Sequence, residues 1–173
     1  MLNIAVIGAG ILVSFFLKGF NFLSLNFERL GGSIIYPDFL LIFVIFFALR
    51  RGEFSGLWIG FFAGLLEDAG LLGYADKTGE FLPIIGTHSL VYCITGFVLG
   101  KVNRLMDKDR TPTIVLLVFV TTLVERGCVW LLVGILEDFN KSYSFMGPAV
   151  YTALLAPVWF FVLGWIYQVQ EER

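Results

Sequence analysis

The feature that most constrains this chain is a succession of long apolar runs that contain almost no charge. Residues 142–170 carry no charged side chain, and the only titratable group among residues 81–100 that matters near neutral pH is His88. A helix needs about 20 apolar residues to cross the hydrocarbon core of a bilayer. Because lipid offers the backbone no hydrogen-bond partners, each crossing segment is expected to be helical. The runs therefore predict an all-α polytopic membrane protein.

Composition narrows the choice further. Hydrophobic residues make up 58% of the chain and charged residues 15%, whereas a soluble domain averages roughly 45–50% and about 25%. These values exclude an ordinary soluble domain, a disordered chain and a nucleic-acid-binding protein. Cys93 and Cys128 lie singly in separate apolar runs, so the sequence predicts no disulfide, no zinc site and no other cofactor.

The runs divide the chain into six expected spans within one membrane domain, residues 1–173. These spans cover about residues 2–25, 34–50, 54–72, 82–101, 112–136 and 146–168, and the polar stretch 73–81 is expected to be an external loop. On one side, the connections and the C-terminus carry Arg50, Arg51, Lys101, Arg104, Lys108, Arg110 and Arg173; on the other side they carry Arg29, Lys77 and Lys141. The positive-inside rule then predicts that both termini are cytoplasmic.

Small residues recur at a spacing of four in two neighbouring spans. The third span has Gly52, Gly56, Gly60 and Gly64, with Asp68 at the next step of four. The fourth span has Gly96 and Gly100, preceded at the same spacing by His88 and Tyr92. Residues at i and i+4 share a helix face, and small side chains let helices approach closely in lipid. Two uses are open: the two spans pack against each other, or the glycines form a docking face for a transmembrane helix of another protein.

Ionisable residues inside the spans form a second pattern. Lys18, Asp38, Glu67, Asp68 and His88 are all expected in the outer half of the membrane. Such groups are costly in lipid, so they are expected to face the protein interior and to be paired. Glu125 and Arg126 lie nearer the middle of their span and project about 100° apart, so Arg126 is expected to meet a carboxylate on another helix.

The outer polar residues admit three interpretations: a satisfied network that fixes helix register, a pocket for a partner or ligand, or a catalytic site. The chain contains no His-Glu-x-x-His, no Gly-x-Ser-x-Gly and no Walker A motif, each of which would point to a specific chemistry. The sequence therefore predicts no enzyme, no catalytic residue and no metal site.

Several motifs occur in an order that resembles the MreD family of bacterial rod shape-determining membrane proteins. They are Pro37-Asp38-Phe39-Leu40-Leu41, Arg50-Arg51-Gly52, the glycine run from Gly56 to Gly64 with Leu65-Leu66-Glu67-Asp68, Ile85-Gly86-Thr87-His88-Ser89-Leu90, and Gly96-Phe97-x-x-Gly100. The resemblance is specific over residues 37–100. Outside these residues it consists only of length and hydrophobic layout.

The resemblance implies a non-catalytic scaffold of the cell-elongation machinery in the bacterial inner membrane. Its partners would be MreC, which has one span and an extracytoplasmic region, the actin-like MreB, RodA and a penicillin-binding transpeptidase. The fold would be similar to the substrate-binding subunits of energy-coupling-factor transporters. That similarity also implies an alternative, a small-solute-binding transporter subunit.

For the scaffold, the expected partner site is a groove between the glycine-bearing helices that takes the span of MreC. Asp38, Glu67, Asp68 and His88 would shape its outer part, and Arg50 and Arg51 would form a cytoplasmic motif.

Overall fold

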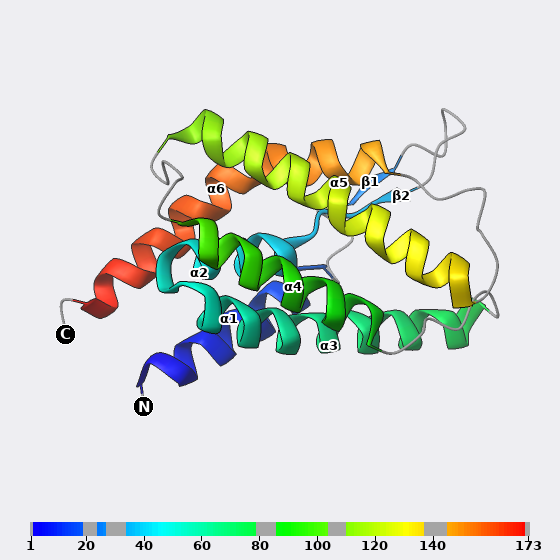
Figure 1. Ribbon diagram of the computed structural model, residues 1–173, viewed down its shortest axis with the longest axis horizontal. Helices are drawn as coiled ribbons and strands as arrows, with labels where there is room; N and C mark the ends of the chain where they lie inside the picture. Colours follow the sequence, from blue (N-terminus) through cyan, green and yellow to red (C-terminus); the bar gives the residue numbers. More distant parts are fainter. Residues whose placement is uncertain are drawn as a thin grey trace.

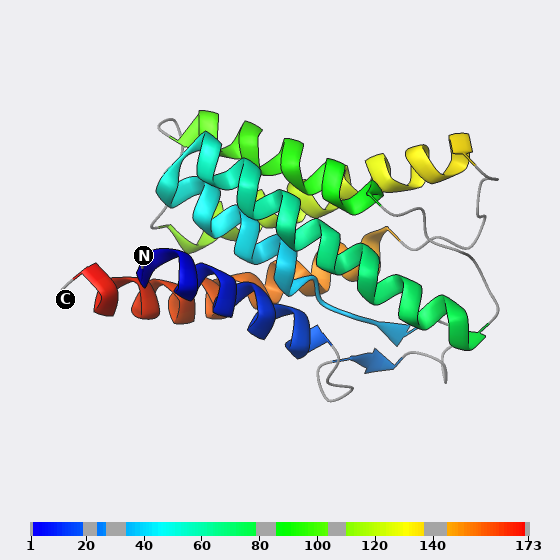
Figure 2. The same ribbon diagram turned by 90° about the horizontal axis from the view of Figure 1, so that it is seen from below.

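The computed structural model describes residues 2–18, 24–26, 34–78, 86–103, 110–136 and 145–171. These residues form six α-helices and one two-stranded antiparallel sheet. The elements are α1 (Leu2–Lys18), β1 (Leu25–Asn26), β2 (Ile34–Ile35), α2 (Phe39–Arg51), α3 (Glu53–Thr78), α4 (Thr87–Val102), α5 (Thr111–Leu136) and α6 (Met146–Glu171). Figures 1 and 2 show a helical bundle in which the start of α1 and the end of α6 lie at the same end.

Helix α2 is the centre of the bundle. Every residue from Phe39 to Leu49 is buried, and the helix contacts α1, α3, α4, α5 and α6. The sequence of α2 (FLLIFVIFFALRR) is apolar on all sides up to its last two residues. A helix of this kind is stable when other elements surround it, and those of the bundle surround α2. Its 13 residues give a length of about 20 Å, which is shorter than the roughly 30 Å hydrocarbon core of a bilayer.

The segments on either side of residues 27–33 correct the expectation of helix throughout the first two spans. Helix α1 ends at Lys18, and Leu25 and Asn26 then pair with Ile35 and Ile34 as antiparallel strands. The residue before a proline favours extended backbone, so Pro37 disfavours helix at Tyr36 and delays the start of α2 to Phe39. The strand pair satisfies backbone groups that a helix would otherwise pair internally.

Helix α3 also differs from its expected bounds. It begins one residue after Gly52, whose φ of +86° lies in the left-handed region and whose N–H donates to the Ala48 carbonyl at 3.0 Å. It continues to Thr78, so the external loop expected at residues 73–81 is wrong for residues 73–78, which are helical. Ala75 and Lys77 are good helix formers, which favours this extension. The remaining residues of that expected loop, 79–81, lie outside the described residues.

The helices pair unequally around α2. Helix α3 packs most extensively on α4, and α5 packs on α6, whereas the contact between α4 and α5 is much smaller. Two described helical segments, Thr111–Ile135 and Met146–Tyr167, are long and apolar enough to cross a membrane, with mean hydropathies of 2.0 and 1.9. Their outward faces carry exposed aliphatic and aromatic side chains such as Ile135 and Phe161. The six expected spans stay a prediction.

Candidate functional site

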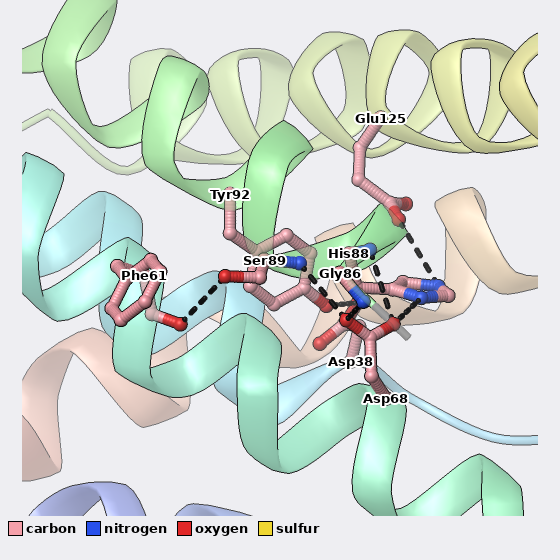
Figure 3. A network of polar contacts seen from close by, with 8 residues as sticks. All are labelled: Asp38, Phe61, Asp68, Gly86, His88, Ser89, Tyr92 and Glu125. Carbon is pink, nitrogen blue, oxygen red and sulfur yellow. Dashed lines mark hydrogen bonds and ion pairs between the residues drawn. The ribbon is translucent and has the colours of Figure 1, made fainter. Parts of the chain in front are cut away.

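A cluster of polar side chains lies inside the bundle, and we call it the polar cluster. Its members are Asp38, Asp68, His88, Tyr92 and Glu125, which Figure 3 shows pointing toward one another. They come from the residue before α2 and from α3, α4 and α5. Asp68 and Tyr92 are fully buried, and Glu125 is 3% exposed. Buried polar groups of this kind are costly unless they are hydrogen-bonded.

Asp68 of α3 caps the N-terminus of α4. Its Oδ2 accepts hydrogen bonds from the backbone N–H of Gly86 at 2.8 Å and of Ser89 at 3.3 Å, and its Oδ1 accepts from the N–H of His88 at 3.1 Å. The N-cap residue of α4 is Gly86, which has no side chain to do this. The first N–H groups of a helix lack intrahelical partners, so Asp68 supplies from another helix the cap that α4 lacks.

Asp38 plays the corresponding role for α2 and joins three helices. Its Oδ1 accepts from the N–H of Leu41 at 2.8 Å, which is an ordinary N-cap bond. Its Oδ2 accepts from the Tyr92 hydroxyl of α4 at 2.5 Å. Its backbone N–H donates to Oγ1 of Thr152 in α6 at 3.1 Å. Asp38, which is partly exposed, and Asp68, which is fully buried, therefore stabilise the starts of α2 and α4.

His88 connects α4 to both α3 and α5. Its Nδ1 lies 2.8 Å from Oδ1 of Asp68, and its Nε2 lies 3.8 Å from Oε1 of Glu125. The histidine side chain is 14% exposed and the Glu125 side chain 3%. Glu67 of α3 is also buried.

The structure brings together three of the residues singled out from the sequence, Asp38, Asp68 and His88. Lys18 belongs to α1, but its side chain lies outside the described part of the chain. Glu125, expected nearer the middle of its span, faces His88, and its depth in the membrane stays a prediction. The proposed pairing of Arg126 with a carboxylate of another helix stays a prediction.

Tyr92 of the polar cluster and Thr152, which accepts the Asp38 N–H, carried weaker signals in the sequence. Tyr92 follows His88 by four residues, which is the spacing of one helix face, but a tyrosine in an apolar run reads equally well as a core side chain. Thr152 carries no signal of its own, since a threonine inside a helix usually bonds within that helix.

The glycines of the third and fourth spans lie between α3 and α4. A Cβ atom built at Gly60 would come within 3.0 Å of the Tyr92 carbonyl, and one built at Gly64 would come within 3.0 Å of the Ser89 backbone. Gly56 and Gly96 face each other across the same interface. Gly100 faces the backbone of Glu53. This chain's own α4 thus occupies the trough that was expected for a partner helix, and a partner using it would have to displace α4.

Arg50 and Arg51 end α2 at the opposite end from the polar cluster. The Arg50 guanidinium lies 5.4 Å from the ring centre of Phe46, and that of Arg51 lies 5.5 Å from the ring centre of Tyr167. Cations near a helix C-terminus interact favourably with the helix dipole, and contact with ring faces adds to this. Both arginines are therefore placed to stabilise the end of α2.

The chemistry available to the polar cluster follows from these contacts. Among the described residues, no group of three His, Cys, Asp or Glu side chains is placed to hold a metal ion. A described pocket of about 330 Å³ lies elsewhere, between the strand pair and the start of α6, and its lining includes Leu25, Ile35 and Val150. The polar cluster can hold helix ends together and can carry protons between carboxylates and the imidazole.

Comparison with known proteins adds the following findings. The family model for rod shape-determining protein MreD matches residues 5–169. The chain is 24% identical over 169 residues to the cell shape-determining protein MreD of Streptococcus pneumoniae (strain ATCC BAA-255 / R6), covering 94% of each chain. No solved structure matches the chain.

Proposed function

We propose, from the premise that this chain belongs to the MreD family of rod shape-determining proteins, that it is a non-catalytic scaffold in the bacterial inner membrane. In this role it binds MreC and helps couple MreB to peptidoglycan synthesis by RodA and a penicillin-binding transpeptidase. It crosses the membrane six times, with both termini in the cytoplasm, in a fold similar to the substrate-binding subunits of energy-coupling-factor transporters.

The arrangement of the chain ends and charges supports the proposed topology. The start of α1 and the end of α6 lie at one end of the bundle (Figures 1 and 2), as an even number of spans requires. Arg50 and Arg51 end α2 with their guanidinium groups against rings, one of which belongs to Tyr167 near the end of α6. Basic residues at the end that carries both termini agree with the positive-inside rule.

The observation that carries the scaffold proposal is the use of both aspartates as helix caps. Each oxygen of Asp68 accepts backbone hydrogen bonds from the start of α4, and each oxygen of Asp38 also accepts a hydrogen bond. A general base or a ligand-binding carboxylate needs an oxygen that faces its substrate. These carboxylates instead hold helices in register, which is what a rigid binding partner requires.

Because the glycine trough lies inside the bundle, we place the MreC span on one of the outward faces. Phe54, Trp58 and Phe62 make α3 the described helix with the most aromatic exposed face, with exposed fractions of 70%, 59% and 53%. The exposed side chains of α4 are aliphatic, for example Ile94 and Val98. Aromatic side chains are enriched where proteins bind each other, so the face of α3 is the first to test.

Site-specific photocrosslinking tests the proposal. A photoreactive amino acid is introduced at Trp58, Ile94, Val124 or Val158, one exposed position on each of α3, α4, α5 and α6, in cells that express MreC from the same organism. The buried Val44 of α2 is the matched control. We expect a crosslink to MreC from one face only. If none of the four positions crosslinks and MreC does not co-purify, the proposed partnership is wrong.

The small-solute alternative has one observation in its favour, the apolar pocket of about 330 Å³ beside the start of α6. Its volume is within the range of small-ligand sites, roughly 300–1,000 Å³. Mass spectrometry of the purified protein for a retained small molecule tests this alternative. A stoichiometric solute that is lost when Gly147 is replaced by Phe, a lining position, would favour the transporter subunit.

A further inference from the structure

His88 of α4 lies between a carboxylate of α3 and a carboxylate of α5. Asp68 accepts three backbone N–H groups, so it is present as an acceptor-only carboxylate. The Nδ1 of His88 lies 2.8 Å from the same carboxylate, and it must carry a hydrogen to form that bond. The contact with Asp68 of α3 therefore keeps Nδ1 of His88 protonated.

The opposite nitrogen then faces an acceptor. Nε2 lies 3.8 Å from Oε1 of Glu125, a side chain only 3% exposed. If His88 were neutral and Glu125 ionised, a nitrogen lone pair would face a carboxylate oxygen in a buried site, which is unfavourable. One proton therefore belongs to this pair, on His88 or on Glu125.

We propose that Asp68, His88 and Glu125 form a proton-dependent latch: the proton shared by His88 and Glu125 holds α5 against the α3–α4 pair, and its release opens the contact between α4 and α5. The latch lies in the bundle interior and would regulate the shape that the bundle presents.

Charged groups around the latch determine how the α4–α5 contact responds to loss of the shared proton. Asp38 at the start of α2 and Glu67 of α3 add negative charge near His88 and Glu125, and Arg126 of α5 adds positive charge next to Glu125. Tyr92 of α4 donates its hydroxyl to Asp38, and α6 contributes Thr152, which does not titrate. After loss of the shared proton, Asp68 and Glu125 are both ionised on either side of a neutral ring. Such a buried, unpaired carboxylate is strongly unfavourable.

Helix α5 is the element that moves to relieve this. Helix α4 is locked to α3 by backbone contacts at Gly56, Gly60 and Gly64 and by the Asp68 cap. The α4–α5 contact is far smaller, and Gly127, two residues after Glu125, has nothing within 4 Å of a Cβ position. A small outward movement of α5 near Glu125 would widen the gap to His88 and let water enter beside the carboxylate.

Distance measurement between spin labels tests the latch in the full chain, reconstituted in lipid nanodiscs. The labels are placed at Ile94→Cys on α4 and Val124→Cys on α5, two exposed positions, after both native cysteines are replaced by alanine. As the pH rises from mildly acidic to mildly alkaline, we expect a second, longer distance to grow at the expense of the first. A second label pair at Phe62→Cys on α3 and Ile94→Cys should keep one distance throughout.

Two variants make the result decisive. Glu125→Gln cannot ionise, and His88→Gln removes the titratable ring, so each should abolish the pH dependence of the α4–α5 distance. Either variant suffices if the other does not insert. An α4–α5 distance that is unchanged over the whole pH range, a pH response that persists in a variant, or a parallel change in the α3–α4 distance would each overturn the proposal.

Discussion

The two sides of α4 are built in different ways. Toward α3, the helices meet backbone to backbone, because Gly56, Gly60 and Gly64 leave no side chain between them. Toward α5, they meet through side chains, and the described polar contact is the 3.8 Å approach of His88 to Glu125. Along its glycines the first contact depends on shape, whereas the second depends on charge. The comparison shows how one helix can be fixed to one neighbour and adjustable against another.

The largest expected effect comes from filling the α3–α4 contact. Gly60→Ala would place a Cβ within 3.0 Å of the Tyr92 backbone, and because backbone cannot rotate away, we expect a loss of about 3 kcal/mol, the upper end for overpacking. The midpoint of thermal unfolding in detergent, followed by circular dichroism, measures this. The matched control is Gly127→Ala on α5, where a Cβ meets nothing within 4 Å and helix propensity predicts a gain of up to about 1 kcal/mol. Equal unfolding midpoints for the two variants would mean that the glycine contact is not tight.

The next-largest effect concerns Asp68, which caps α4 and also contacts His88, the residue that faces α5. Asp68→Ala removes the cap from Gly86, His88 and Ser89, so we expect a loss of about 2 kcal/mol, the upper end for a helix cap. Asp68→Asn keeps one acceptor oxygen and should lose less. Amide hydrogen exchange at the start of α4 gives the local readout, with Glu53→Gln in the first turn of α3 as the control. If hydrogen exchange at the start of α4 is unchanged in Asp68→Ala, Asp68 does not stabilise this helix start.

Sequence reasoning recovered the α3–α4 side of this comparison better than the α4–α5 side. Glycines at a spacing of four predict a close helix contact wherever they occur, because only geometry along one helix is involved. They do not say whether the neighbour is α4 or another chain, since both offer a backbone. Asp38, Asp68 and His88 were found because an ionisable group in an apolar run is costly and therefore conspicuous.

The features that sequence reasoning missed depend on tertiary contacts. The level of Glu125 relative to His88 follows from where α4 and α5 begin, and the start of α4 is capped by Asp68, a residue of another helix. The sequence predicts helix at Leu25, Ile34 and Ile35, which lie in the strand pair, because a short apolar run has no periodicity that separates strand from helix.

A smaller effect sharpens the comparison within the polar cluster. Tyr92→Phe removes the hydroxyl that donates to Asp38, and because hydrogen bonds to charged groups contribute most, we expect a loss of about 1.5 kcal/mol. Tyr167→Phe is the control: its ring packs edge-on against Phe46 and Phe47 at the other end of α2, and the ring is retained. Thermal unfolding of the two variants in the same detergent should differ. If they unfold alike, the bond between α4 and Asp38 adds nothing to stability.

The smallest effect separates hydrogen bonds that join helices from those that stay within one. Thr152→Val removes the acceptor for the Asp38 N–H of a different helix and should cost about 1 kcal/mol, because a buried donor is left without its partner. Thr122 is equally buried, but its hydroxyl donates to the Val118 carbonyl of its own helix. The loss in Thr122→Val should therefore stay near about 0.5 kcal/mol, the lower end for a hydrogen bond. Both exchanges keep side-chain shape, so the difference between their unfolding midpoints isolates the interhelical bond. If Thr122→Val loses more stability than Thr152→Val, the hydrogen bond within α5 matters more than the one between Asp38 and α6. That result would contradict the role of Asp38 in joining helices.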